Sequence, residues 1–195
     1  MATFNGQLIV PMPTFPAAPR SIEWQANDIV GVNTNPFTGQ QQLQQWNASY
    51  LEASVTMQNM SNAQAIAWFT WLLAMEGTAN VFQMGDPLNS KPQNPAAVSP
   101  VASGGGQTGY QIVTTGGSNI TVGDWIQMGF RLYRITTISG GTLGIWPQIR
   151  ESPSNGQGLS LYNPVGIWRL KSNTRKISVR ETKMYGISFD IREAI

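Results

Sequence analysis

The 195-residue sequence contains no cysteine and no histidine. Without cysteine there can be no disulfide bonds, thiolate nucleophiles, zinc ribbons or iron–sulfur clusters. Without histidine the chain lacks the commonest general base, the commonest transition-metal ligand and any Ser-His-Asp triad. Catalysis would have to depend on carboxylates, lysine or tyrosine alone. Because disulfide bonds are excluded, the stability of the chain must come from packing and assembly.

Carboxylates are few as well, and they form no DxD or ExxE motif and no Asp-rich loop. Asp124 stands alone in a Gly-Asp-Trp turn and makes no metal site, because calcium and magnesium need several oxygen ligands. A two-carboxylate glycosidase stays open on sequence alone, because its acids can come from distant strands. No pattern points to one, so we expect no enzymatic activity, no catalytic residue, no cofactor and no metal. The ten carboxylates are Glu23, Asp28, Glu52, Glu76, Asp86, Asp124, Glu151, Glu181, Asp190 and Glu193.

Charged residues make up only 11% of the chain, against about a quarter in ordinary soluble domains. Hydrophobic residues make up 41%, so much of the surface lacks the charge that normally keeps it solvated. Such a surface suits burial against other subunits. The alternative is a monomeric β protein with a neutral surface rich in Gly, Asn, Gln and Ser.

The few charges are unevenly placed. Up to residue 130 there are two bases and six acids, and from Arg131 onward there are ten bases and four acids. The two parts therefore carry −4 and +6. A basic half can indicate nucleic-acid binding, but these bases are spread along the chain. They favour complementary faces that meet between neighbouring subunits, and we expect no specific affinity for nucleic acid.

The apolar stretch that begins at Leu8 fits neither a signal peptide nor a membrane span. No basic residue precedes it, and prolines interrupt it at positions 11, 13, 16 and 19. We therefore expect synthesis in the cytoplasm and no membrane span. The first twenty residues are typical of an extended, proline-rich arm, a kind of segment that often packs on a neighbour.

Two strands and one helix are predicted before residue 85. Residues 21–32 contain a strand, turn residues follow at 33–39, and residues 43–57 alternate as a long strand with a bulge near Tyr50 and one buried face. Ser61 and Gln64 form a capping box and Gly77 a stop for a helix over 62–76. This helix is apolar nearly all round, so one face should pack on a sheet and the other on something else. Trp68 and Trp71 are expected in the core.

From Gly85 the chain becomes rich in proline and then glycine, which predicts a domain boundary. Short strands with tight Gly-Gly turns follow and predict a small barrel of the OB or SH3-like kind. Longer alternating strands resume after Asn163-Pro164 and resemble a closing hairpin. We expect a β domain with one helix, residues 1–85 plus 164–195, interrupted by an inserted barrel, residues 86–163. The predicted barrel strands are 110–115, 125–129, 131–138, 142–147 and 159–162.

Three other features have simple structural interpretations. The glycines at 104–106 are no phosphate loop, because no lysine and no helix signal follow them at the required spacing, and they are interpreted as a hinge. The glutamine-rich tract 40–45 runs into a strand and should supply polar residues there. Five aromatic residues in or beside the barrel could stack on sugars or single-stranded nucleic acid, but core filling is the favoured interpretation. They are Trp125, Tyr133, Trp146, Tyr162 and Trp168.

Several stretches, taken in order, resemble a group of bacteriophage tail proteins. No single stretch is diagnostic and none is catalytic, so the resemblance rests on their order along most of the chain. They are Ala26-Asn27-Asp28-Ile29-Val30, Pro36-Phe37-Thr38, the Trp-rich helix 63–77, Gly85-Asp86-Pro87, Gly123-Asp124-Trp125-Ile126, Ile145-Trp146-Pro147, Asn163-Pro164-Val165-Gly166, Arg169-Leu170 and Tyr185-Gly186-Ile187-Ser188-Phe189.

The expected architecture, a β domain with an OB-like insertion, looks like that of distal tail proteins of long-tailed phages. The resemblance implies a tail-tube-like β-sandwich domain with an OB-like insertion. It also implies a homomeric ring, expected to be a hexamer, that binds the tail-tube protein and the tail-tip or baseplate hub protein in the virion and leaves a channel for DNA. Two alternatives remain: another tail-tip or short-tail structural protein, and a carbohydrate-binding host-attachment module.

Overall fold

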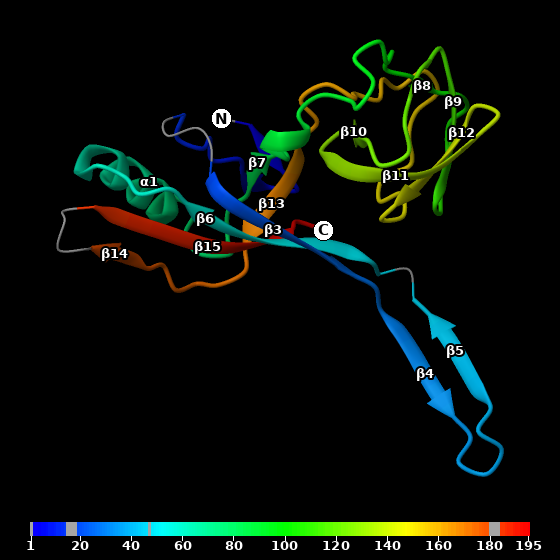
Figure 1. Cartoon of the computed structure of the whole chain (residues 1–195), viewed down its shortest axis with the longest axis horizontal. Helices are drawn as coiled ribbons and strands as arrows, with labels where there is room; N and C mark the ends of the chain where they lie inside the picture. Colours follow the sequence, from blue (N-terminus) through cyan, green and yellow to red (C-terminus); the bar gives the residue numbers. More distant parts are fainter. Residues whose placement is uncertain (1, 15–18, 47, 180–183) are drawn as a thin grey trace.

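The computed structural model of the chain describes residues 2–14, 19–46, 48–179 and 184–195. Within these residues the chain is mainly β, and its strands form several sheets and a half-barrel (Figure 1). Its single α-helix is also as expected. In the same part of the chain, no helix is both long and apolar enough to cross a membrane.

The largest sheet has six strands, and segments from both ends of the sequence form it. Its order is β3-β6-β15-β13-β7, and β14 also pairs with β15. Strict alternation along β15 buries every second side chain, which leaves one face of the sheet for the core. The strands are β3 (Pro19–Asn27), β6 (Tyr50–Met57), β7 (Phe82–Met84), β13 (Gly166–Leu170), β14 (Ile177–Val179) and β15 (Tyr185–Glu193).

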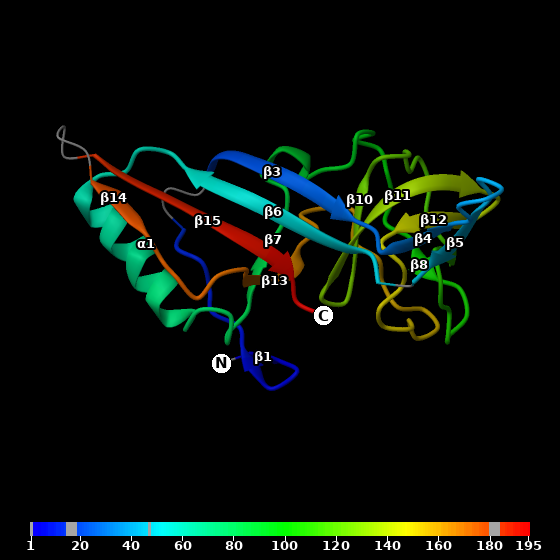
Figure 2. The ribbon, with the colours of Figure 1, turned by 90° about the horizontal axis from the view of Figure 1, so that it is seen from below.

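The helix α1 (Asn62–Ala74) lies along one side of this sheet (Figure 2). The predicted cap is present, because the Ser61 backbone N–H donates to the Gln64 side chain at 2.9 Å. Trp68 and Trp71 are buried, and their rings lie 6.3 and 5.5 Å from that of Phe189 on β15. The prediction that both tryptophans are core residues is confirmed.

Residues 97–161 supply a second core, enclosed by the half-barrel. Its sheet has the order β10-β11-β12-β9-β8. The strand predicted at 159–162 is not formed; isolated bridges from Gly158 to Val101 and from Ser160 to Gln127 connect this segment to β8 and β10 instead. A short 3₁₀ helix, η1 (Pro87–Asn89), precedes the half-barrel. The strands are β8 (Val101–Ala102), β9 (Gln111–Thr115), β10 (Trp125–Met128), β11 (Arg131–Ser139) and β12 (Thr142–Trp146).

The long strand predicted over 43–57 is wrong, because the chain is interrupted between two shorter strands. These are β5 (Gln41–Gln45) and β6, and the Ala48 N–H donates to the Trp46 carbonyl at 2.8 Å between them. The alternation before and after the interruption therefore belongs to two separate strands, which accounts for the change of phase in the sequence. β5 pairs with β4 (Val30–Thr34) in a separate two-stranded hairpin that projects from the body of the molecule (Figure 1).

The N-terminal segment is not a free arm. It forms a hairpin of β1 (Thr3–Phe4) and β2 (Gln7–Leu8), and the Phe4 ring packs against Phe130 at 5.6 Å. Ile9 then forms a parallel bridge to Val81, and Val10 is buried in the main core. The apolar side chains of residues 4–10 are therefore buried or half-buried against their own chain. Residues 15–18 lie outside the described residues.

Candidate interaction surface

The β4–β5 hairpin is an isolated two-stranded ribbon. Its strands pair from Val30↔Gln45 to Thr34↔Gln41, and neither pairs with any other strand in the described part of the chain. Its turn is ordered by Asn35, whose side chain accepts from the Phe37 N–H at 2.9 Å. Both outer edges therefore present backbone donors and acceptors that a further chain can use.

One face of the hairpin is apolar. Val32 and Leu43 are direct cross-strand partners, and Val30 lies two residues from Val32, so all three side chains share this face. Val32 is 58% exposed and Leu43 is 66% exposed. At the tip, Phe37 is 94% exposed and buries almost nothing against its own chain. We call Val30, Val32 and Leu43 the apolar face.

The base of the hairpin is held in place from the other face. The Trp46 ring packs on Gly31, where an added Cβ would lie 2.9 Å from the ring and force the ring to shift. Nearby, the Asp28 carboxylate accepts a hydrogen bond from Trp146 Nε1 of the half-barrel at 3.0 Å. These contacts fix the direction in which the hairpin projects.

The hairpin carries none of the usual protection against association. Residues 29–51 contain no charged residue, whereas exposed edge strands of soluble proteins are commonly protected by charge, by proline or by a covering segment. Single exposed apolar residues are normal, but a contiguous set on an uncharged projection marks an interaction site. The hairpin is the strongest candidate for such a site in the described residues.

A second apolar surface lies at the opposite end of the molecule (Figure 1). Ile66 and Leu73 are exposed residues of α1 and do not belong to its buried face. Val179 on β14 and Met184 beside β15 are also exposed. The expectation that one helix face packs on the sheet is confirmed, and the other face, expected to pack on something else, is exposed in the single chain. The two apolar surfaces belong to opposite ends, so one chain cannot bring them together.

Aromatic rings join the half-barrel to the main sheet. Trp24 on β3 lies 5.7 Å from Trp125 on β10 and 5.4 Å from Trp168 on β13, measured between ring centroids. Gly166 is in close contact with Leu132, because a Cβ on Gly166 would lie 2.9 Å from Leu132 Cβ. Trp125 and Leu132 belong to the main core although they come from the half-barrel strands.

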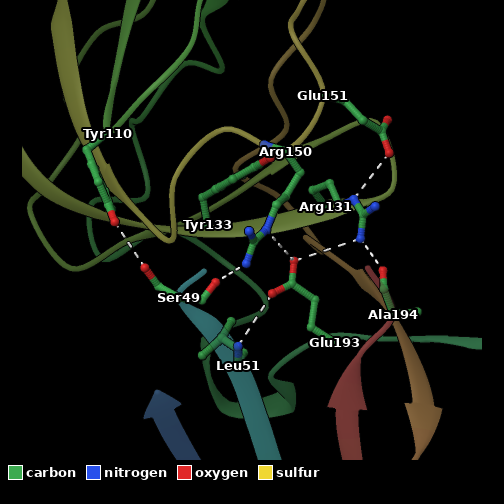
Figure 3. Close-up of polar contacts among 9 residues, drawn as sticks. All are labelled: Ser49, Leu51, Tyr110, Arg131, Tyr133, Arg150, Glu151, Glu193 and Ala194. Atoms are coloured by element: carbon green, nitrogen blue, oxygen red, sulfur yellow. Dashed lines mark hydrogen bonds and ion pairs between the residues drawn. The ribbon is translucent and has the colours of Figure 1, made fainter. Parts of the chain in front are cut away.

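A buried ionic cluster spans the same junction (Figure 3). Glu193 at the end of β15 lies 3.9 Å from Arg131 and 3.8 Å from Arg150, and both arginines come from the half-barrel segment. All three side chains are buried. The Leu51 N–H of β6 also donates to Glu193 at 3.4 Å. The Glu193 carboxylate of the main sheet therefore forms ion pairs with two arginines of the half-barrel.

Further hydrogen bonds extend this cluster in both directions (Figure 3). Arg131 donates to the Ala194 carbonyl, and Arg150 donates to the Ser49 carbonyl. The Ser49 hydroxyl is 3.1 Å from the Tyr110 hydroxyl. Arg131 also reaches Glu151 at 3.2 Å, but this partner is half exposed. These contacts hold the half-barrel in one orientation on the sheet.

Burial dominates the ionisation of this cluster. It raises the pKa of Glu193, while the nearby charges of Arg150 and Arg131 lower it. Burial also raises the pKa of Tyr133 to about 12, so its hydroxyl stays neutral and accepts the Arg150 N–H at 3.1 Å. The cluster is suited to holding two parts of the chain together, and nothing in its geometry forms a substrate cleft.

The five aromatic residues flagged in the sequence do not form a platform. Trp125, Tyr133 and Trp168 are buried, Trp146 is half-buried and Tyr162 is exposed. Core filling is confirmed for Tyr133 within the half-barrel, whereas Trp125 and Trp168 fill the junction. In the described residues, no group of three or more acids could hold a metal ion.

The sequence analysis did not predict the hairpin as an exposed feature. The signal that could have indicated it is the absence of charged residues from 29 to 51.

No protein-family model matches the chain, and no curated protein matches it in sequence.

Replacing residues 88–162 by a short Gly-Ser linker tests whether the half-barrel is a separate insertion. The strands on either side of it pair directly, with Gly166 opposite Met84, so a short linker can connect them. We expect the remaining sheet and helix to melt cooperatively, at a lower temperature because Trp24, Trp168 and Phe4 lose apolar neighbours. Circular dichroism during heating measures this, and a broad, non-cooperative transition would show that the boundary is wrong.

Proposed function

We propose that the chain is a structural protein of a phage tail, a distal-tail-type subunit that closes into a homomeric ring. The ring joins the tail tube to the tip or baseplate hub and leaves a channel for DNA. The observation that carries the proposal is the β4–β5 hairpin, an uncharged projection with an exposed apolar face. Such a ribbon stabilises nothing in its own chain, so its use lies in contact with another molecule.

Head-to-tail association supports a ring over a two-fold dimer. The hairpin and the exposed helix face lie at opposite ends of the molecule (Figures 1 and 2). Contacts between unlike surfaces are heterologous, and they generate either a closed ring or an open filament. A ring satisfies the hairpin of every subunit and leaves none exposed. The contacts at the junction hold the half-barrel in one orientation on the sheet. A closed ring requires that every subunit have the same shape.

The distribution of cations supports a channel that lets DNA pass. Arg131 and Arg150 contact Glu193, and Lys171 and Arg192 lie 2.7 and 3.9 Å from Glu52. Each of these four bases of the positive half therefore has a carboxylate of its own chain within 4 Å, which offsets part of its charge. Tight binding of DNA depends on free cations that displace counterions from phosphates.

Host attachment through an aromatic sugar platform has less support. Trp125 and Tyr133 are buried, so their faces cannot stack on a sugar ring without unfolding the half-barrel. We therefore assign the half-barrel a structural role on the ring, in contact with other tail-tip proteins.

Electron microscopy of the purified chain tests the proposal. We expect single-layered rings with a central hole, and labelling of intact tails by an antibody to this chain at the distal end of the tube. Particles without a hole, or label confined to the capsid, would contradict the assignment.

A further inference from the structure

A notch opens at the helix end of the molecule, between α1 and the strands β13 to β15. Its volume is about 440 Å³. Leu72, Leu170 and Phe189 contribute apolar lining, and Ser188, Arg175 and Lys176 contribute polar lining. Asp190 also lines the notch, and its carboxylate accepts a hydrogen bond from the Ser54 hydroxyl.

We infer that the hairpin tip of one subunit inserts Phe37 into this notch of the next subunit. The inference rests on the proposed ring and identifies the contact that closes it. The occupant is a second copy of this chain, because the hairpin and the notch are at opposite ends of one molecule and cannot meet within it (Figure 1).

The hairpin tip is built as an anchor. Phe37 is 94% exposed, while the turn that carries it is already ordered by Asn35, which accepts from the Phe37 N–H and donates its own N–H to the Gln40 carbonyl at 2.9 Å. A large aromatic side chain on a preorganised turn loses little conformational entropy when it is buried. Aromatic anchors of this kind dominate the energetics of protein contacts.

The lining of the notch complements such an anchor. Its apolar residues suit a phenyl ring, and the side chains of Arg175 and Lys176 are cations that favour the face of an aromatic ring. Arg175 Nε is buried without a hydrogen-bond partner among the described residues, so its own chain does not fully fix this side chain. The tip brings carbonyl acceptors and no charge. The tip itself therefore brings no ion that would have to be moved out of water.

The absence of cysteine makes the contact directly testable. We would introduce Thr38→Cys at the tip and Ser188→Cys in the notch, and oxidise the assembled protein. A disulfide forms only when the two Cβ atoms come within about 3.5–4.5 Å. We expect covalent multimers from this pair, and none from either single variant or from Thr38→Cys combined with Ser152→Cys on an exposed loop of the half-barrel.

A second variant keeps the wild-type notch and turn. Phe37→Ala removes only an exposed phenyl group, so the fold of the subunit should be unchanged. We expect the oligomeric ring of this variant to dissociate at a subunit concentration at least about tenfold higher than that of wild type, as for a truncated hot spot. A closed ring that gives no disulfide between positions 38 and 188 would overturn the docking inference while leaving the ring proposal intact. The same covalent multimers from Thr38→Cys combined with Ser152→Cys would also overturn it. If no ring forms at all, the proposed function fails as well.

Discussion

Replacing Arg131 by methionine will lower the free energy of unfolding by about 3 kcal/mol, the loss typical of a buried ion pair broken on one side. Methionine keeps the length of the side chain but leaves Glu193 buried with only Arg150 nearby, and it leaves the Ala194 carbonyl without the Arg131 donor. Urea denaturation at a matched protein concentration measures the loss.

The same variant should show a specific pH dependence. Burial already raises the pKa of Glu193, and Arg131 is one of two cations that lower it, so its removal raises the pKa further. The folded chain then holds a proton at pH values where the unfolded chain, with a glutamate pKa of about 4.3, has released it. Stability is therefore gained as pH falls through this window. The deficit of Arg131→Met relative to wild type should shrink from pH 7 to about pH 5.

Glu151→Gln is the matched control, because Glu151 contacts the same Arg131 at 3.2 Å but its side chain is 52% exposed, against 6% for Glu193. An exposed ion pair contributes only about 0–1 kcal/mol, so this variant should be near wild type at every pH. Equal losses from Arg131→Met and Glu151→Gln, or a deficit that does not change with pH, would contradict the role given to the buried cluster.

We expect charges on the apolar face of the hairpin to convert the proposed ring into monomers. The variant combines Val32→Lys with Leu43→Glu. These positions are direct cross-strand partners, so the new charges attract each other across the ribbon and preserve it. Both side chains are exposed in the single chain, and the melting temperature of the monomer should not change. Burying two charges at a subunit contact is strongly unfavourable. Sedimentation velocity measures the shift from ring to monomer.

The control places the same charges on the opposite face of the same ribbon. Asn33 and Gln42 are also direct partners, one register position nearer the tip, and the control combines Asn33→Lys with Gln42→Glu. We expect this variant to assemble like wild type, because its face remains in water. Rings formed equally well by both charged variants would show that the apolar face is not the contact.

Features with short-range signals could be predicted from the sequence. The helix boundaries follow from Ser61, Gln64 and Gly77, which lie within the helix or next to its ends. Four of the five predicted half-barrel strands, β9 to β12, follow from alternating residues between glycine turns, whereas the strand predicted at 159–162 is not formed. In each of these cases the residues that determine the structure are neighbours in sequence.

Features that depend on distant contacts could not be predicted. The break before β6 leaves β5 paired only with β4 among the described strands, and beside it the Trp46 ring packs on Gly31 of that hairpin. The N-terminal segment folds back because Phe4 meets Phe130, and no local pattern announces that partner. The ionic cluster joins Arg131 to Glu193 across most of the C-terminal part of the chain. The sequence shows that residues 29–51 lack charge, but only the structure shows that residues 30–45 of this stretch form a hairpin exposed to solvent.

Native mass spectrometry of the purified chain at micromolar concentration tests the central claim most directly. A closed homomeric ring predicts a single dominant species at a fixed multiple of the 21.3 kDa chain mass, six-fold for the expected hexamer. This species should be lost in the Val32→Lys, Leu43→Glu variant and retained in the Asn33→Lys, Gln42→Glu control. A wild-type chain that stays monomeric, or a continuous series of multiples typical of an open filament, would contradict the account.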